Sequence, residues 1–420
     1  MKKRLHKLLL VLMLSSNLQA DIQEAGDIVQ ILVPLGALAG TYIADDSEGR
    51  MMFAKGFALN VATVHTTKFL VDKWRPKAQN PDSFPSGHTA AAFGGAAFVQ
   101  TRYGYAYGVP AFALASFVGY TRIESEWHYS DDVLAGASLA LVSNWAFAEP
   151  LVDDIRVSVE PINDGVKISA NIPIGETQQK KTPTIDIQTK EFKPDVRFIF
   201  EFGAAWMMKN DIASQHNSSN VIDMEIYGAT ADPTTSIRSG FEFYLNDANE
   251  VLAQFSPYTI RAVGTLNSAI NFDGVGFNTT EETLIAYKWD AYKLRWRYNF
   301  LDNNIFVVKA GLGVVLSRVV TELSTDTKAE KVAVTTVLPI AHLHLGVNIN
   351  DSELYTEVDG GRIEDECTLD AALMYRYKIS KHWDVGGGYR FERVVVDDSQ
   401  LYNEFISHNV VMNLGYAFLY

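Results

Sequence analysis

The spacing of apolar residues changes near residue 196, and this change restricts the possible folds more than any other feature of the sequence. From residue 196 to the C-terminus, apolar and polar residues alternate, which is the period of a strand with two unlike faces. In YKLRWRYNF (292–300), every even position is aromatic or leucine, and every odd position is basic or asparagine. Such an aromatic face is either buried against a second sheet or exposed to lipid.

Turn spacing and the C-terminal segment favour exposure to lipid, in a transmembrane β-barrel. Short turns are expected near 246–249, 301–304, 349–352 and 380–382, and longer polar loops near 209–233, 266–281, 322–331 and 397–404. Short and long connections alternate in this way when the two ends of a barrel face different compartments. We predict an antiparallel barrel of about ten strands, within a range of eight to twelve, and keep a secreted β-sandwich as the alternative.

The last ten residues, VMNLGYAFLY, alternate and end in an aromatic residue. They are similar to the terminal strand by which outer-membrane barrels are recognised for assembly. The barrel assembly machinery and outer-membrane lipid are therefore expected partners, and the bacterial outer membrane is the expected location.

The segment 25–150 has a different character, with apolar runs rich in Ala, Gly, Leu and Val, such as TAAAFGGAAFVQT and VLAGASLALVSNWAFA. We expect five or six closely packed helices. None of the runs clearly reaches the length of a membrane span, and charged residues stand near their ends. Because a barrel protein must cross the inner membrane whole, we expect a periplasmic globular domain, with a bundle in the inner membrane as the alternative.

Residues 1–20 are typical of a secretory signal peptide. MKKRLHK is basic, LLLVLML is a short apolar core, and Ala20 ends a small-residue cleavage site. The predicted organisation is therefore a signal peptide (1–20), a helical domain (21–150), a hairpin and polar linker (151–195) and a barrel (196–420). The hairpin is expected to turn at Asp164-Gly165.

Charge and cysteine content exclude two further classes of protein. The net charge of −14 gives no support for nucleic-acid binding, which requires a basic face. One cysteine cannot form an intrachain disulfide, so packing alone must stabilise the fold.

The segment FPSGHTAAAF (84–93) places a hydroxyl, a glycine and a histidine where a helix is expected to begin. A helix N-terminus has unpaired N–H groups and the positive end of the macrodipole, and both attract anions. Ser86 can cap the helix, Gly87 allows close approach of a ligand to the backbone, and His88 can transfer a proton. An ordinary capped helix with a surface histidine is the alternative.

Cations and a second histidine flank this segment. Lys68 and Arg75 are seven residues apart, which would put both on one face of a helix that Pro76 ends. Arg122 precedes His128 and Asp132, which would be neighbours on a helix, so that the carboxylate could hold one ring nitrogen. Each feature alone fits a solvated surface, but together they predict a phosphate pocket with a nucleophile and a proton donor.

The order K-x6-RP, PSGH and R-x5-H-x3-D resembles the three-part signature of the phosphatidic acid phosphatase type 2 superfamily, which includes class A acid phosphatases and vanadium haloperoxidases. The third motif usually opens with Ser-Arg, whereas this chain has Thr121-Arg122, which keeps a hydroxyl. The resemblance implies an all-α helical bundle and covers Lys68 to Asp132 but not the barrel.

The resemblance also implies a role for each motif residue. His128 would attack phosphorus and become a phosphohistidine, Asp132 would orient it, and His88 would protonate the leaving oxygen and then activate water. The phosphate oxygens would be held by Lys68, Arg75, Ser86, Gly87 and Arg122. No metal or cofactor is required, because cations and N–H donors stabilise the transition state.

We therefore expect a periplasmic phosphatase that acts on a phosphorylated lipid or a small phosphomonoester. Two alternatives remain open. One is vanadate-dependent peroxidation in the same pocket. The other is a non-enzymatic barrel, a channel or surface protein, with a vestigial helical domain. His342 and His344 in AHLHLG are expected to face the lumen of the barrel.

Overall fold

The computed structural model describes residues 22–76, 80–151, 156–162, 165–171, 196–214, 221–224, 233–303 and 305–418. The chain folds as two compact units, one mostly helical and one built on strands. The expected signal peptide and the linker after residue 171 lie outside the described residues. The predicted domain boundaries stay predictions.

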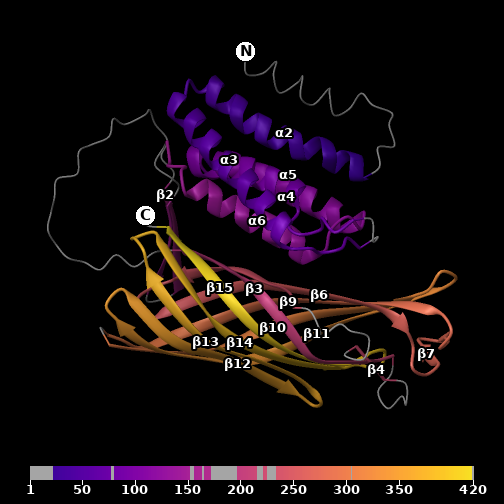
Figure 1. Ribbon diagram of the computed structural model, residues 1–420. Coiled ribbons are helices and arrows are strands. Elements are labelled where there is room, and N and C mark those ends of the chain that lie inside the picture. The colour runs from indigo at the N-terminus through magenta and orange to yellow at the C-terminus, as the bar shows by residue number, and fades with distance from the viewer. Residues whose placement is uncertain are drawn as a thin grey trace. The chain divides into compact units, whose positions relative to one another are not determined.

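The described part of the first unit confirms a helical bundle (Figure 1). Its helices are α2 (Ile22–Ile43), α3 (Ser47–Leu70), α4 (Gly87–Tyr103), α5 (Tyr105–Glu124) and the second half of α6 (Ser130–Trp145), of which residues 130–138 belong to the second unit. The central helix α4 is buried along Ala92, Ala96 and Ala97, which are no more than 1% exposed. Small residues bring its backbone close to α2: a Cβ atom on Gly95 would lie 2.7 Å from the Cα atom of Pro34.

Helix α2 differs from its sequence-based interpretation. Among the described helices it is long and apolar enough to cross a membrane, judged by length and composition only. The expectation that no run reaches this length is therefore wrong for α2. The helix continues through Pro34 and spans Ile22–Ile43.

A short hairpin follows the helices. Strand β1 (Arg156–Ile162) pairs antiparallel with β2 (Gly165–Asn171), and Ile162 lies opposite Gly165. The predicted hairpin is therefore confirmed; Gly165 begins β2, and the residues that join the two strands lie outside the described residues.

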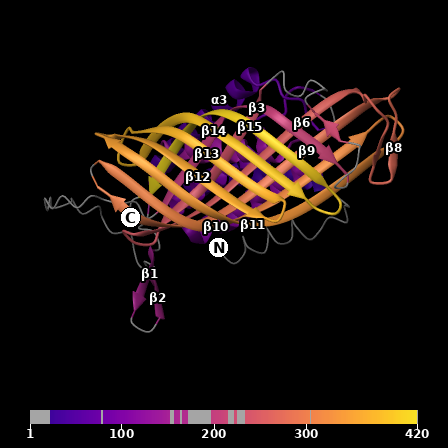
Figure 2. The same cartoon turned by 90° about the horizontal axis from the view of Figure 1, so that it is seen from below.

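The second unit contains a closed antiparallel barrel (Figure 2). Its ten strands are β3 (Val196–Ala213), β5 (Thr234–Tyr244), β6 (Asn249–Thr265), β9 (Glu282–Asp302), β10 (Phe306–Ser324), β11 (Ala329–Ile349), β12 (Ser352–Ile363), β13 (Glu366–Lys378), β14 (Trp383–Asp397) and β15 (Tyr402–Phe418). Strand β15 pairs with β3 from Tyr402–Ala213 to Phe418–Val196, which closes the barrel. The prediction of about ten strands is confirmed.

Strand β9 shows why the alternation predicted a barrel. Tyr292, Leu294 and Trp296 are 44–51% exposed, whereas Lys293 and Arg295 are buried. The aromatic residues therefore face outward, and the basic residues face the lumen. A soluble β-sandwich would bury the aromatic face and expose the charged one. The observed orientation is the opposite and matches an outer-membrane-type barrel.

The connections between strands differ in part from the predicted ones. Strands β10 and β11 are joined by the four-residue turn 325–328, and β14 and β15 by the turn 398–401. The long loops predicted near 322–331 and 397–404 are therefore wrong, because most of the first segment and half of the second lie in paired strands. A two-residue turn at Glu364-Asp365 was not predicted. The loop 266–281 is long and contains strands β7 (Ile270–Phe272) and β8 (Val275–Phe277).

The lumen contains a dense set of ion pairs, here called the lumen network. Its cations are Arg197, Arg238, Lys293, Arg295, Arg297, Lys309, Arg376 and Arg390; its carboxylates are Glu201, Glu242, Glu250, Glu353, Glu357, Asp359, Asp370, Asp384 and Glu392. His342 and His344 are buried as predicted and contact Asp359 at 2.7 Å and Glu353 at 2.9 Å. Each charged residue of the lumen network thus has at least one neighbour of opposite charge.

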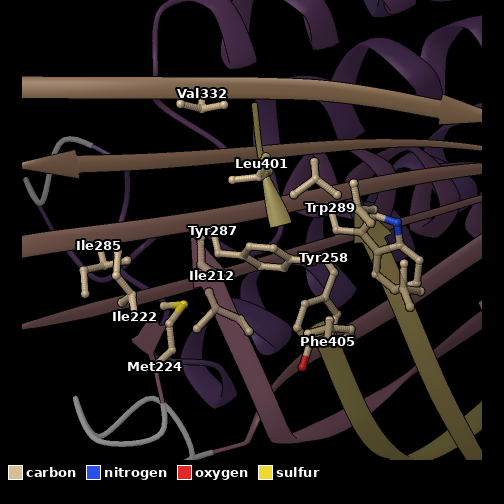
Figure 3. Packing of buried hydrophobic residues seen from close by; sticks show 14 of the residues in the cluster. Ile212, Ile222, Met224, Tyr258, Ile285, Tyr287, Trp289, Val332, Leu401 and Phe405 are labelled. Atoms are coloured by element: carbon tan, nitrogen blue, oxygen red, sulfur yellow. The ribbon is translucent and has the colours of Figure 1, made fainter. Parts of the chain in front are cut away.

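A second part of the barrel interior is apolar. Tyr258, Tyr287 and Trp289 surround Phe405, with ring centroids 4.9–5.7 Å apart (Figure 3). The strands β7 and β8 extend this cluster, because Phe272 and Phe277 are fully buried in it. Packed side chains therefore occupy this part of the interior.

Candidate active site

The segment from residue 83 to residue 88 folds as the sequence predicts. Helix α4 begins at Gly87, and the hydroxyl of Ser86 accepts hydrogen bonds from the Thr89 amide at 3.4 Å and from the Thr89 hydroxyl at 2.9 Å. Ser86 is fully buried. The N–H groups of the first turn of α4, that of Gly87 included, therefore stand beside His88 at the helix N-terminus.

Lys68 and Arg75 do not share a helix, contrary to the prediction. Helix α3 ends at Leu70, and Val71 is extended, so Arg75 lies in the following loop. The chain leaves the helical conformation at Val71, four residues before Arg75, so Pro76 is not what ends the helix. The Lys68 ammonium donates to the carbonyl oxygen of Asp82 at 2.7 Å, and the Arg75 guanidinium lies 4.8 Å from the ring centroid of Trp127.

His128 also lies outside a helix, in the loop between α5 and α6. Its Nδ1 atom is 2.7 Å from the carbonyl oxygen of Ser83. Because a carbonyl can only accept, Nδ1 carries the proton and the lone pair is on Nε2. The predicted helical neighbourhood of His128 and Asp132 is therefore wrong. Asp132 is fully buried in the first turn of α6, and its predicted role stays a prediction.

Arg122 is buried at the end of α5 and is held by several acceptors. Its Nε and Nη2 atoms donate to the Thr121 hydroxyl at 3.2 and 3.1 Å, and its Nη1 atom donates to Asp27 at 2.7 Å. Threonine in place of the usual serine therefore keeps the hydroxyl that holds the guanidinium. The backbone N–H of His128 donates to the Arg122 carbonyl at 3.1 Å, which keeps the two residues together.

Charged residues from several helices and loops act on His88, which shows that these segments meet near its ring. Burial and the positive charge of Arg122 lower the pKa of His88 to about 4, with smaller contributions from His128 and Arg75, whereas Asp27 acts in the opposite direction. His88 Nε2 is 3.3 Å from Asp27 Oδ1. Residues from α2, α4, the loop after α3 and the end of α5 thus surround one point.

Sequence reasoning missed three parts of this arrangement. Asp27 and Gln23 lie on α2, about 95 residues from Arg122, and nothing in the sequence near them indicates a shared site. The carbonyl of Ser83 could not be predicted either, because a backbone acceptor leaves no signal in residue type. No group of three or more His, Cys, Asp or Glu residues that could hold a metal ion occurs among the described residues.

The comparisons with known proteins agree with the motifs. Residues 51–150 match the PAP2 superfamily. Over 134 residues the chain is 35% identical to a lipid A 1-phosphatase of Porphyromonas gingivalis, and this alignment covers 30% of each chain. The chain therefore spans less than a third of the length of that relative.

Solved structures resemble each unit separately. The helical part is similar to Aquifex aeolicus LpxE, with 22% identity, a TM-score of 0.27 and coverage of 30% of this chain and 81% of that one. The barrel part is similar to the outer membrane protease OmpT of Escherichia coli, with 12% identity, a TM-score of 0.38 and coverage of 55% and 99%.

Proposed function

Because residues 51–150 form a PAP2 superfamily domain, we propose that the protein is a metal-independent phosphatase of lipid phosphates, anchored by its barrel. The observation that carries the proposal is the convergence of His88, His128, Arg122 and Arg75 beside the N-terminus of α4. Two imidazoles among cations and backbone donors can bind a phosphate and transfer it without a metal.

The geometry of His128 supports a phosphohistidine intermediate. With its proton on Nδ1, donated to Ser83, the ring presents the Nε2 lone pair to phosphorus. A bond from Nε2 to phosphorus would form as the bond from phosphorus to the ester oxygen breaks. Arg122, Arg75 and Lys68, with the Ser86 hydroxyl and the Gly87 N–H, would hold the phosphoryl oxygens, and Asp132 would balance the charge on His128.

His88 is suited to carry the proton in both half-reactions. Its pKa of about 4 leaves it neutral at neutral pH in the free protein. A bound phosphate brings negative charge beside the ring and raises that pKa, which favours the protonated acid. His88 would give its proton to the leaving oxygen. It would then take a proton from the water that attacks phosphorus and breaks the bond to Nε2.

The lipid A 1-phosphatase relative supports a lipid phosphate as substrate, and a soluble phosphomonoester is the other outcome of the test. The outward aromatic residues of the barrel support anchorage in the outer membrane. In this proposal the phosphatase domain would lie in the periplasm. The same pocket chemistry implies inhibition by vanadate, which mimics the five-coordinate phosphorus.

The test is phosphate release by the full chain purified from outer-membrane fractions. The substrates would be p-nitrophenyl phosphate, phosphatidic acid, a polyprenyl diphosphate and lipid A, with a chelator present. We expect vanadate-sensitive release that His128→Ala abolishes and that His65→Ala, which changes an exposed histidine of α3, leaves intact. Folded wild-type protein that releases no phosphate from any of them would contradict the proposal.

A further inference from the structure

The first turns of α2 lie directly against the candidate site, although they precede the segment that matches the PAP2 superfamily. The Gln23 carbonyl accepts from Arg122 Nη2 at 2.9 Å, and the Gln23 side chain accepts from Trp127 Nε1 at 2.9 Å. A Cβ atom on Gly26 would lie 2.1 Å from the Thr121 hydroxyl oxygen, so only glycine permits this approach. Helix α2 is therefore fitted closely to the third motif.

Asp27 continues the same face of α2, since it lies four residues after Gln23. One of its oxygens, Oδ1, accepts from Arg122 Nη1 at 2.7 Å and lies 3.3 Å from His88 Nε2. The Arg122 side chain is 3% exposed, whereas those of Asp27 and His88 are each 40% exposed. The carboxylate thus joins a buried cation to a half-buried imidazole that opens to solvent.

We propose that Asp27 is a positioning residue of the phosphatase site, which fixes the Arg122 guanidinium and holds a proton on His88. The inference rests on the proposed function and adds a residue from outside the matched segment. Of the charged groups acting on His88, Arg122, His128 and Arg75 disfavour its protonated form, and Asp27 favours it. Removal of the Asp27 charge leaves a histidine surrounded by positive groups, so a smaller fraction of His88 carries the proton that the leaving oxygen needs.

The sharpest variant is Asp27→Asn, which keeps the shape of the side chain and an acceptor for Arg122 but removes the charge. The pH dependence of kcat/KM reports the pKa of the acid in the free enzyme. Because the variant loses the charge that favours protonated His88, the alkaline limb of this pH profile should move about one pH unit towards acid. Above that limb kcat/KM should fall about tenfold, and at low pH it should approach the wild-type value.

Two variants serve as controls. Asp27→Glu keeps the charge and should restore the position of the limb at least in part. Glu24→Gln removes an exposed carboxylate one turn earlier on α2 and should leave the limb unchanged. Thermal unfolding of each variant, followed by circular dichroism, shows whether the helices remain folded.

Two kinetic results would overturn the inference. If Asp27→Asn lowers kcat/KM equally at every pH, the residue has only a structural role. If it leaves the limb unchanged and tightens inhibition by inorganic phosphate, Asp27 competes with the substrate for Arg122 instead of supporting catalysis.

A measurement without turnover separates this inference from the proposed function. The ring carbon resonance of His88, labelled with carbon-13 and assigned with His88→Ala, is titrated in detergent-solubilised wild type and Asp27→Asn. A lower pKa in the variant supports the role of Asp27 even if none of the tested phosphates is hydrolysed. An unchanged pKa overturns it even if the wild type is an active phosphatase.

Discussion

Asp46 provides a sharp test of how the helical unit is held together. It lies between α2 and α3 and caps α3 by accepting from the Gly49 amide at 2.8 Å. Its two oxygens also accept from Arg102 Nε at 2.8 Å and Nη2 at 2.7 Å, and one accepts from the Tyr103 hydroxyl at 3.0 Å. The side chains of Asp46 and Arg102 are each 3% exposed. Asp46→Ala therefore removes a cap and leaves a buried guanidinium without its buried carboxylate partner.

The expected loss of stability follows from these contacts. Breaking a buried ion pair by removing one partner costs about 3–5 kcal/mol, and loss of an N-cap costs about 1 kcal/mol. Because one side chain makes both interactions, we expect about 4 kcal/mol for Asp46→Ala. Asp46→Asn keeps an acceptor for the cap and should cost about half as much.

Acid should reduce the difference between wild type and Asp46→Asn. The hydrogen bond from Arg102 holds the pKa of Asp46 at about 2, below its ordinary value of 3.8. A carboxyl with a lowered pKa in the folded state stabilises the protein above the unfolded pKa, and this contribution is lost as the pH falls. The two proteins should therefore differ most above about pH 4 and become similar as the pH falls towards 2.

The assay is thermal unfolding of the helical signal at 222 nm in detergent. For a unit of this size, about 4 kcal/mol corresponds to a decrease in Tm of about 10–15 °C. The matched control is Glu48→Ala, which removes a carboxylate 3.4 Å from the same arginine but 71% exposed, and should change stability by less than about 1 kcal/mol. A decrease for Asp46→Ala no larger than for Glu48→Ala would refute the reasoning.

Three further outcomes are expected. Gly95→Val should destabilise the bundle by about 2 kcal/mol in the same assay, because the new side chain meets the backbone of Pro34; an unchanged Tm would contradict the close helix contact. Ser86→Ala should lower the stability of the bundle by about 1 kcal/mol through loss of the cap, and it should raise the KM for phosphate substrates. An unchanged KM would exclude Ser86 from phosphate binding. Asp370→Ala should lower the stability of the barrel by about 3–5 kcal/mol, measured by unfolding in urea, because three lumen cations lose this carboxylate as a partner. Unchanged unfolding in urea would show that the lumen network does not stabilise the barrel.

The sequence by itself determined the two architectures and the residue types of the candidate site. Periodicity is a local property, so alternation from residue 196 was enough to predict strands with one aromatic face, and the turn spacing and the C-terminal segment then favoured a barrel. Ser86 as the cap of α4 was predictable for the same reason, because a cap acts on the next three residues.

Only the tertiary structure decided how these residues meet. Arg75 and His128 lie in loops, where helical spacing has no meaning, and a backbone carbonyl accepts a hydrogen bond from the His128 ring. Asp27 reaches Arg122 because Gly26 lets α2 approach Thr121, a contact between segments about 95 residues apart. Spacing along the chain describes only a few neighbouring turns, whereas the packing of whole helices brings distant residues into one site.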